Sequence, residues 1–457
     1  MRYTPHTEAE RQAMLKAIGV ERIEDLFADI PAQVRFPSLD LPEGMSELEA
    51  QRLFAALAAE NATVATHPCF LGAGAYYHFT PALLTHLLFR GEFYTAYTPY
   101  QPEISQGTLQ VIFEFQTLVC QLTGMDVANA SMYDGSTALA EAALMAVRLT
   151  RSRRTRLLIS EAVHPEYRDV VATYSQGMDI ELVPIPFDRR NGTTDVEAVR
   201  AALNEHTAAL IVQYPNFFGQ IEPLGQLGEL IHGVGGHFVV SADPVALGLL
   251  KPPGDFGADI VTAEGQSLGI PLMYGGPYVG LFATRMKHVR QMPGRVAGQT
   301  VDIEGRRGFV LTLQAREQHI RREKATSNIC TNEALIATAV TIYLSAVGRH
   351  GLRQVANLCY HKAHYLAQRL TALDGYELAF EGPFVREFAV RTPVPPAELN
   401  RYLWETHGII GGYDLERAYP ELKNHWLLTA TEMNARADID RLVEAVAGYP
   451  GSPAPSR

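Results

Sequence analysis

Between Ser136 and about Ala283, helical segments alternate with short apolar runs, and this alternation restricts the fold more than any other feature of the chain. Such a pattern indicates βαβ units, in which successive strands lie parallel and helices cover both faces of the sheet. The last two apolar runs have no helix between them, so we expect one of them to join the sheet antiparallel. The sequence therefore predicts an α/β fold with a mostly parallel sheet. The expected strands are 156–160, 181–185, 208–213, 237–242, 259–262 and 277–283.

The regions on either side of this pattern predict further structural units. Two capping boxes, Thr7 with Glu10 and Ser46 with Glu49, predict helices in an N-terminal arm. A helix-like segment precedes the alternating region, and a long helix is expected from Asn332, followed by a compact α+β domain. The expected divisions are a helical arm at 1–62, a large domain at 63–331, a small C-terminal domain at 332–447 and a disordered tail at 448–457.

Composition excludes several classes of protein. A net charge of −11 gives no basic surface for nucleic acid or anionic lipid. The four cysteines are far apart and have no metal-ligand spacing, so we expect neither a disulfide framework nor a metal site. The N-terminus has no apolar signal region, and no apolar run is as long as a membrane span. These features predict a cytoplasmic protein.

Three features stand where an enzyme of the type I pyridoxal phosphate (PLP) class would need them. Gly135, Ser136 and Thr137 open a helix after a turn, and the free N–H groups and dipole of such a helix attract phosphate. Asp243 ends an apolar strand, where a carboxylate would hold the pyridine nitrogen protonated. His164 follows another strand and would stack on the ring. Each has an ordinary alternative: the hydroxyl residues and Asp243 as helix caps, and His164 as a structural residue.

The lysine that such an enzyme requires is missing. A PLP enzyme holds its cofactor as a Schiff base to a lysine, normally one strand after the aspartate. Here that strand is followed by Gly265 and Gln266, and an amide cannot form a Schiff base. Of 39 basic residues only six are lysines, with Lys251 too early and Lys287 too late in the chain. The sequence therefore predicts a phosphate cradle without its anchoring lysine.

Four stretches of the sequence, 70–77, 94–107, 128–131 and 323–331, are similar to a known family. They strongly resemble the N-terminal half of the glycine cleavage P-protein family, and the resemblance extends to about residue 445. The family implies a type I PLP-transferase-like large domain, with the lysine and the covalently bound PLP in the second half. In some organisms the two halves are separate subunits, and the length of 457 residues matches the first.

The resemblance also implies an activity and partners. With a PLP-bearing second subunit, the chain would act as a glycine dehydrogenase (decarboxylating): glycine loses CO2, and its aminomethyl group passes to the lipoyl group of H-protein. The expected assembly is a heterotetramer of two first and two second subunits. This chain would contribute interface and residues of a composite site. The candidates for that site are Tyr97, Thr98, Tyr100, Gln101, Thr326, Ser327, Asn328 and Thr331.

Two other hypotheses remain at this point. The chain could be a free-standing PLP-fold pseudoenzyme that senses a phosphate ligand. It could also be an active decarboxylase or desulfurase that uses Lys251 or Lys287, which the positions of these lysines disfavour.

Overall fold

A computed structural model describes residues 5–329 and 331–451, and the chain divides into two compact units, Met1–Ala62 and Thr63–Arg457. The first unit contains α1 (Glu8–Ile18) and α2 (Glu47–Ala59), each opened by the predicted capping box, in which the hydroxyl side chain and the glutamate three residues later exchange hydrogen bonds with the backbone. The helices predicted for the arm are therefore confirmed.

A seven-stranded sheet forms the centre of the second unit, in the order β1-β7-β6-β5-β4-β2-β3. Five neighbouring strands run parallel, and β7 is antiparallel to β6, as the missing helix between the last two apolar runs predicts. The mostly parallel α/β sheet is confirmed. The strands are β1 (Val127–Ala128), β2 (Arg156–Ser160), β3 (Glu181–Ile185), β4 (Thr207–Tyr214), β5 (His237–Ala242), β6 (Ile260–Glu264) and β7 (Gly280–Thr284).

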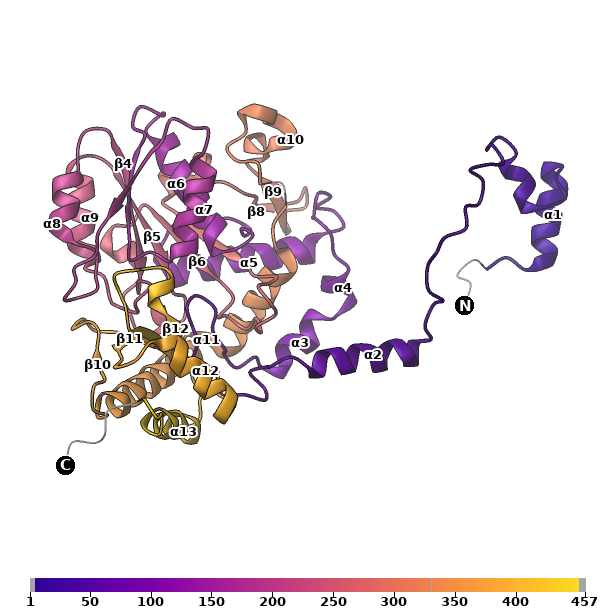
Figure 1. The fold of residues 1–457 in the computed structure, drawn as a ribbon. Helices are drawn as coiled ribbons and strands as arrows, with labels where there is room; N and C mark the ends of the chain where they lie inside the picture. Colours follow the sequence, from indigo (N-terminus) through magenta and orange to yellow (C-terminus); the bar gives the residue numbers. More distant parts are fainter. Residues whose placement is uncertain (1–4, 330, 452–457) are drawn as a thin grey trace. The chain divides into compact units, whose positions relative to one another are not determined.

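Helices cover both faces of this sheet, as Figure 1 shows. Successive side chains of a strand point to opposite faces, and in β5 Phe238 and Val240 join one core cluster while Val239 joins the other. One cluster lies under α6 and α7, and the other under α5, α8, α9 and the first part of α11. These helices are α5 (Gln106–Thr123), α6 (Gly135–Leu149), α7 (Pro165–Ser175), α8 (Val196–Ala202), α9 (Leu224–Gly233) and α11 (Ala334–Thr371).

A second, antiparallel sheet lies in the C-terminal part, in the order β10-β11-β13-β12. The second part of α11 packs on it with α12 and α13, so α11 takes part in both cores. By length and hydropathy α11 qualifies as a membrane span, but half of its most apolar window is buried in the protein, and Gly348 interrupts it with a φ of 58°. The division between large and small domains stays a prediction, and residues 452–457 of the expected tail lie outside the described residues. The elements are β10 (Glu377–Leu378), β11 (Glu387–Arg391), α12 (Pro396–His407), β12 (Tyr413–Asp414), β13 (His425–Thr429) and α13 (Arg436–Ala447).

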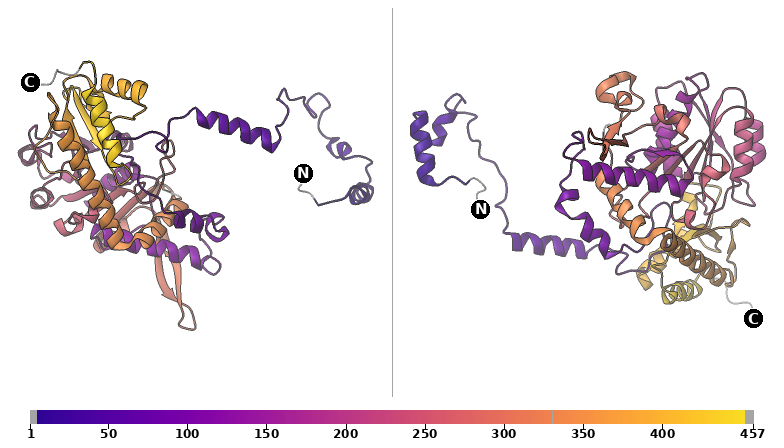
Figure 2. Two further views of the ribbon diagram at one scale, coloured as in Figure 1. Left: turned by 90° about the horizontal axis from the view of Figure 1, so that it is seen from below. Right: turned by 180° about the vertical axis from the view of Figure 1, so that it is seen from behind.

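A hairpin of β8 (Val296–Val301) and β9 (Arg307–Thr312) was not predicted from the sequence. The side chains of its outer half, residues 299–307, are all exposed, so this half lacks the buried face of a half-buried strand. In the left view of Figure 2 it projects from the body, and Ile303 at its tip is fully exposed. The remaining short helices are α3 (Ala82–Leu88), α4 (Gly91–Tyr94) and α10 (Gln318–Arg321).

Candidate functional site

The predicted PLP-site residues gather at the carboxyl ends of β4, β5 and β6, beside the N-terminus of α6. This is the edge where open α/β sheets bind ligands. His164 and Asp243 line one small cavity there, and Gly135 and Gln266 lie next to its wall through Glu264. The cavity volume is about 40 Å³, whereas ligand pockets measure about 300–1,000 Å³. The cavity is therefore too small for a nucleotide-sized or PLP-sized ligand.

The carboxylate of Glu264 lies where the sequence suggested a phosphate. Glu264 is the last residue of β6, and its two oxygens accept hydrogen bonds from three backbone N–H groups: Gly135 at 2.8 Å, Gln266 at 2.9 Å and Val279 at 3.2 Å. Burial raises the pKa of Glu264 to about 7, although these three hydrogen bonds favour the charged form. The chain thus supplies its own acidic group at the start of α6.

The hydroxyl residues of the candidate cradle are used for capping. The Asp134 carboxylate accepts from the Ser136 hydroxyl at 2.7 Å, and from the backbone N–H and hydroxyl of Thr137 at 2.7 and 2.9 Å. Asp134 is the N-cap residue of α6. A phosphate would have to displace Asp134 to reach these donors, so their contacts match the ordinary helix-cap interpretation.

The side chain of Gln266 binds the backbone of a neighbouring loop, at the position where a PLP enzyme would carry its lysine. Its side chain is 1% exposed, and its Oε1 accepts from the backbone N–H of Tyr76 at 2.9 Å. Its Nε2 donates to the carbonyl oxygens of Tyr76 and Ile270 at 2.9 and 2.8 Å. Both ends of the amide are therefore satisfied by backbone, and Gln266 fixes the loop that carries Tyr76 against the sheet.

Asp243 pairs with an arginine of the small sheet. Its Oδ2 lies 2.7 Å from Nη2 of Arg386, whose side chain is only 3% exposed. The Arg386 guanidinium also lies 3.6 Å from the centre of the Tyr76 ring. The second oxygen of Asp243 accepts from the backbone N–H groups of Val245 and Ala246. Both oxygens are engaged within this chain, and the Arg386 guanidinium already supplies the positive partner that a protonated pyridine nitrogen would otherwise provide.

The ring of His164 stacks on the ring of Tyr167, a residue of this same chain, and not on a cofactor ring. Its ring lies 4.8 Å from the Tyr167 ring at an interplanar angle of 25°. Nδ1 of His164 accepts from the backbone N–H of Glu166, and Nε2 lies 3.0 Å from the carbonyl oxygen of Ala73. Only the tautomer protonated on Nε2 makes both bonds, and burial lowers the pKa of His164, which favours this neutral form.

These residues do not fit PLP. Glu264 and Asp134 accept from the predicted phosphate donors at the start of α6, Gln266 stands in place of the lysine, and Arg386 is paired with the aspartate. Among the described residues no lysine lines this cavity: Lys251 lies over the Phe256 ring, and Lys287 lies at the opposite edge of the sheet beside Asp259. The geometry also argues against the phosphate-sensor hypothesis, because the cradle donors already have partners.

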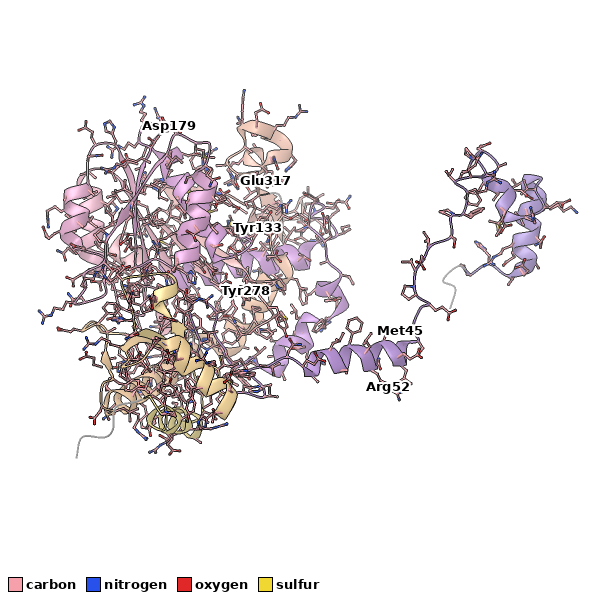
Figure 3. All side chains as sticks on the ribbon, in the orientation of Figure 1. Met45, Arg52, Tyr133, Asp179, Tyr278 and Glu317 are labelled. Atoms are coloured by element: carbon pink, nitrogen blue, oxygen red, sulfur yellow. The ribbon has the colours of Figure 1, made fainter. Side chains whose placement is uncertain are left out.

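A hydrogen bond, an ion pair and a backbone contact connect the candidate loops of the composite site. The Tyr100 hydroxyl accepts from Nη2 of Arg295 at 2.7 Å, and the guanidinium lies 5.1 Å from the Tyr100 ring centre. Nε of Arg295 is 3.5 Å from the carboxylate of Glu317, and both side chains are about 95% buried, with 4% and 6% exposed. Figure 3 labels Glu317 beside α10. The backbone of Thr326 donates to the carbonyl oxygen of Arg316, next to Glu317.

The other candidates differ in their surroundings. Tyr97 is 77% exposed and Gln101 is also exposed, whereas Thr98 is half-buried. In the loop of residues 326–331, the Ser327 hydroxyl donates to the Glu141 carboxylate at 2.7 Å. Asn328 is exposed and Thr331 half-buried. The structure therefore places Tyr100 and Thr326 in one network, Ser327 in a neighbouring contact, and Tyr97, Gln101 and Asn328 on the surface.

Several important residues were missed from the sequence. Glu264 stands two positions before Gln266, so an acidic residue at a strand end was its available signal. No sequence signal pointed to Arg386, or to the pair of Arg295 and Glu317, because their partners are distant in sequence.

Comparisons with known proteins agree with this fold over the whole chain. The family model of the glycine cleavage system P-protein matches residues 1–446. A probable glycine dehydrogenase (decarboxylating) subunit 1 from Thermomicrobium roseum is 56% identical over 448 residues, covering 98% of this chain and 99% of the relative. Its counterpart from Anoxybacillus flavithermus is 54% identical over 449 residues, covering 98% and 99%.

Solved structures give the same result. A crystal structure of glycine decarboxylase (P-protein) of the glycine cleavage system, in inhibitor-bound form, has a TM-score of 0.89 and 45% identity, covering 98% of this chain and 99% of that one. A sphingosine-1-phosphate lyase from Burkholderia pseudomallei has a TM-score of 0.63 at 15% identity, covering 91% and 93%, and supports the fold alone. The PLP-transferase-like fold is thereby confirmed, and the chain belongs to the glycine cleavage system P-protein family.

Proposed function

We propose that this chain is the lysine-free first subunit of a two-subunit glycine dehydrogenase (decarboxylating). A second subunit binds PLP covalently, and this chain completes the site across the interface. When bound there, PLP supplies the electron sink for decarboxylation. Lipoylated H-protein then receives the aminomethyl group. The assembly is a heterotetramer in the cytoplasm.

The observation that carries the proposal is the closed cavity at the edge of the sheet. The polar groups around it are already paired within this chain, through Glu264, Gln266 and the ion pair of Asp243 and Arg386. A chain that keeps the fold of a PLP enzyme but fills the cofactor position with its own side chains needs a second chain for that chemistry. The relatives' designation as subunit 1 supports the same conclusion.

A large apolar surface supports a partner subunit. Isolated exposed apolar residues are common, but a cluster of large ones in one stretch of chain marks an interaction surface. The stretch from Leu71 to Ile104 exposes eight such side chains. They are Leu71 (40%), Phe79 (56%), Leu83 (50%), Phe89 (59%), Tyr94 (56%), Tyr97 (77%), Tyr100 (48%) and Ile104 (77%).

Co-expression tests the proposal. We expect this chain and a lysine-bearing P-protein subunit to co-purify as a complex. The complex should contain PLP and exchange the glycine carboxyl group with bicarbonate, whereas this chain alone should neither contain PLP nor catalyse the exchange. Reduction with borohydride followed by peptide mapping should label only the partner. Stoichiometric labelling of Lys251 or Lys287, or two subunits that stay separate at micromolar concentration, would contradict the proposal.

Tyr100→Phe tests the composite site. The Tyr100 hydroxyl is fixed by the buried Arg295, while the ring remains 48% exposed and accessible to a partner. We expect a stability loss of about 1 kcal/mol from the missing hydrogen bond. We also expect glycine–bicarbonate exchange to fall at least tenfold, about 1.4 kcal/mol of barrier, with PLP content unchanged.

Tyr94→Phe is the matched control, because Tyr94 lies in the same exposed stretch and packs on Phe89 at a ring distance of 5.2 Å. It should leave the exchange rate unchanged. Normal exchange together with a lowered melting temperature in Tyr100→Phe would assign Tyr100 a purely structural role.

A further inference from the structure

A cluster of three histidines and one aspartate lies at the edge of the sheet opposite the closed cavity. Asp259 precedes β6, His237 begins β5, and His232 lies in the last turn of α9. Because β7 is antiparallel, its end lies at this same edge, with Thr284 paired to Ile260, and His288 follows it. Four chain segments therefore bring imidazole and carboxylate groups to one place. They line or adjoin an open hollow of about 610 Å³.

We propose that His232, His237, Asp259 and His288 form a binding site for Zn²⁺ or a chemically similar divalent transition metal ion. Imidazole nitrogens with one carboxylate are a donor set that zinc prefers, and four donors complete its tetrahedral coordination. The site is structural, because four protein ligands leave no open position on a tetrahedral ion.

The distances within the cluster favour metal ligation over hydrogen bonding. Nδ1 of His237 lies 3.8 Å from Oδ2 of Asp259, and Nε2 of His288 lies 3.6 Å from Oδ1. Both separations exceed a hydrogen bond. Two donors bound to one tetrahedral zinc ion lie about 3.3 Å apart, given bonds of about 2.0–2.1 Å. One ligand atom from each of His237, Asp259 and His288 lies within 4.8 Å of the other two, so rotation of these side chains would bring them around one ion.

One histidine nitrogen in the cluster is left without a partner. Nε2 of His288 is buried and accepts or donates no hydrogen bond within the described residues. A buried polar atom without a partner costs about 1–3 kcal/mol, and a metal ion would satisfy it. His232 reaches Oδ2 of Asp259 at 2.9 Å and is 41% exposed, so its ring can turn to become the fourth ligand.

The backbone around Asp259 is fixed before any metal binds. Its Oδ2 accepts from the backbone N–H of Phe238 at 3.0 Å, and its carbonyl oxygen accepts from the Thr284 hydroxyl at 2.8 Å. Such supporting contacts orient metal ligands in known sites.

Two cations lie near the cluster. Arg285 donates to the carbonyl oxygens of Ala258 and Gly254, which directs its guanidinium to the backbone. Lys287 lies 3.6 Å from Asp259 but is 68% exposed, so it can move into solvent.

A second group of potential ligands, His78, Cys359 and Glu432, does not support a comparable site. Its members are already hydrogen-bonded to one another, with His78 and Cys359 2.7 and 3.3 Å from the same Glu432 oxygen. Arg386 also adjoins His78 there. The cluster around Asp259 is therefore the better metal candidate.

Cobalt titration of the full-length, tag-free chain after removal of metals tests the proposal. We expect one equivalent of Co²⁺ to bind with the strong visible absorption of a four-coordinate ion, and Zn²⁺ to displace it. His237→Asn and His288→Ala should each weaken binding at least tenfold. His206→Ala is the matched control, because His206 is an exposed histidine beside Glu205 that does not line the hollow, and it should change nothing.

Lys287→Gln keeps the test decisive if a histidine variant fails to fold. It removes a positive charge beside Asp259 from an exposed side chain, so binding should tighten about fivefold, the effect of one nearby charge in water. The weak absorption of six-coordinate Co²⁺, or equal affinities of wild type, His288→Ala and Lys287→Gln, would overturn the proposal.

Discussion

Replacing Asp243 with asparagine is expected to lower the free energy of unfolding by about 3–5 kcal/mol, without changing the PLP content of the assembled enzyme. The carboxylate is the ion-pair partner of Arg386, whose side chain is 3% exposed. Asparagine keeps an oxygen for the backbone N–H groups of Val245 and Ala246 but leaves the buried guanidinium without a counter-charge. Denaturant unfolding of the variant chain measures the loss, and absorbance of the complex measures PLP.

The double variant Asp243→Asn with Arg386→Met separates the ion pair from other contacts. Removing both charges should cost less than the sum of the single losses, because no unpaired charge is then left buried. If Asp243→Asn instead kept full stability while the complex lost PLP or exchange activity, Asp243 would be acting on a cofactor.

Glu264→Ala is expected to destabilise the chain by about 3 kcal/mol or more, because three buried N–H groups lose their acceptor at about 1–3 kcal/mol each. These are the groups of Gly135, Gln266 and Val279. One of them opens α6, so millimolar phosphate or sulfate should raise the melting temperature of the variant but not of the wild type. An equal response of both proteins would show that Glu264 does not occupy an anion position.

Glu264→Gln is the isosteric control and also tests the pH dependence. Burial raises the pKa of Glu264 from 4.5 to about 7. The folded state therefore binds more protons than the unfolded state between these values, and stability falls as pH rises through this window. The loss amounts to up to about 3 kcal/mol at 1.4 kcal/mol per pKa unit. Glu264→Gln lacks this component, so its stability should fall less than that of the wild type between pH 5 and 8.

Glu222 and Glu387 are also buried with pKa values raised to about 7. They remain in both proteins, so the difference between the wild type and Glu264→Gln isolates Glu264. Parallel pH profiles of the two proteins would show that Glu264 does not titrate in this range.

The sequence was most informative where the structural signal is local. The capping boxes at Thr7 and Ser46 and six of the seven strands of the large sheet follow from side-chain period and from donors within a few residues, whereas the two-residue strand β1 was missed. The antiparallel β7 followed from the missing helix before it. The β8–β9 hairpin was missed because its outer half is held by backbone pairing with exposed side chains, which leaves no alternation to read.

The sequence by itself determined the α/β fold, the family and the absence of a lysine at position 266. Only the tertiary structure decided what took the place of the cofactor, because Arg386 meets Asp243 across 143 positions of chain and Gln266 meets Tyr76 across 190. The same holds for His288, which reaches Asp259 only because antiparallel β7 returns the chain to the amino edge of the sheet, and for His232, which α9 brings to that edge before β5 begins. Hydrogen bonds and ion pairs act over a few ångströms of space, so residues far apart in the chain become partners only after the strands have been placed side by side.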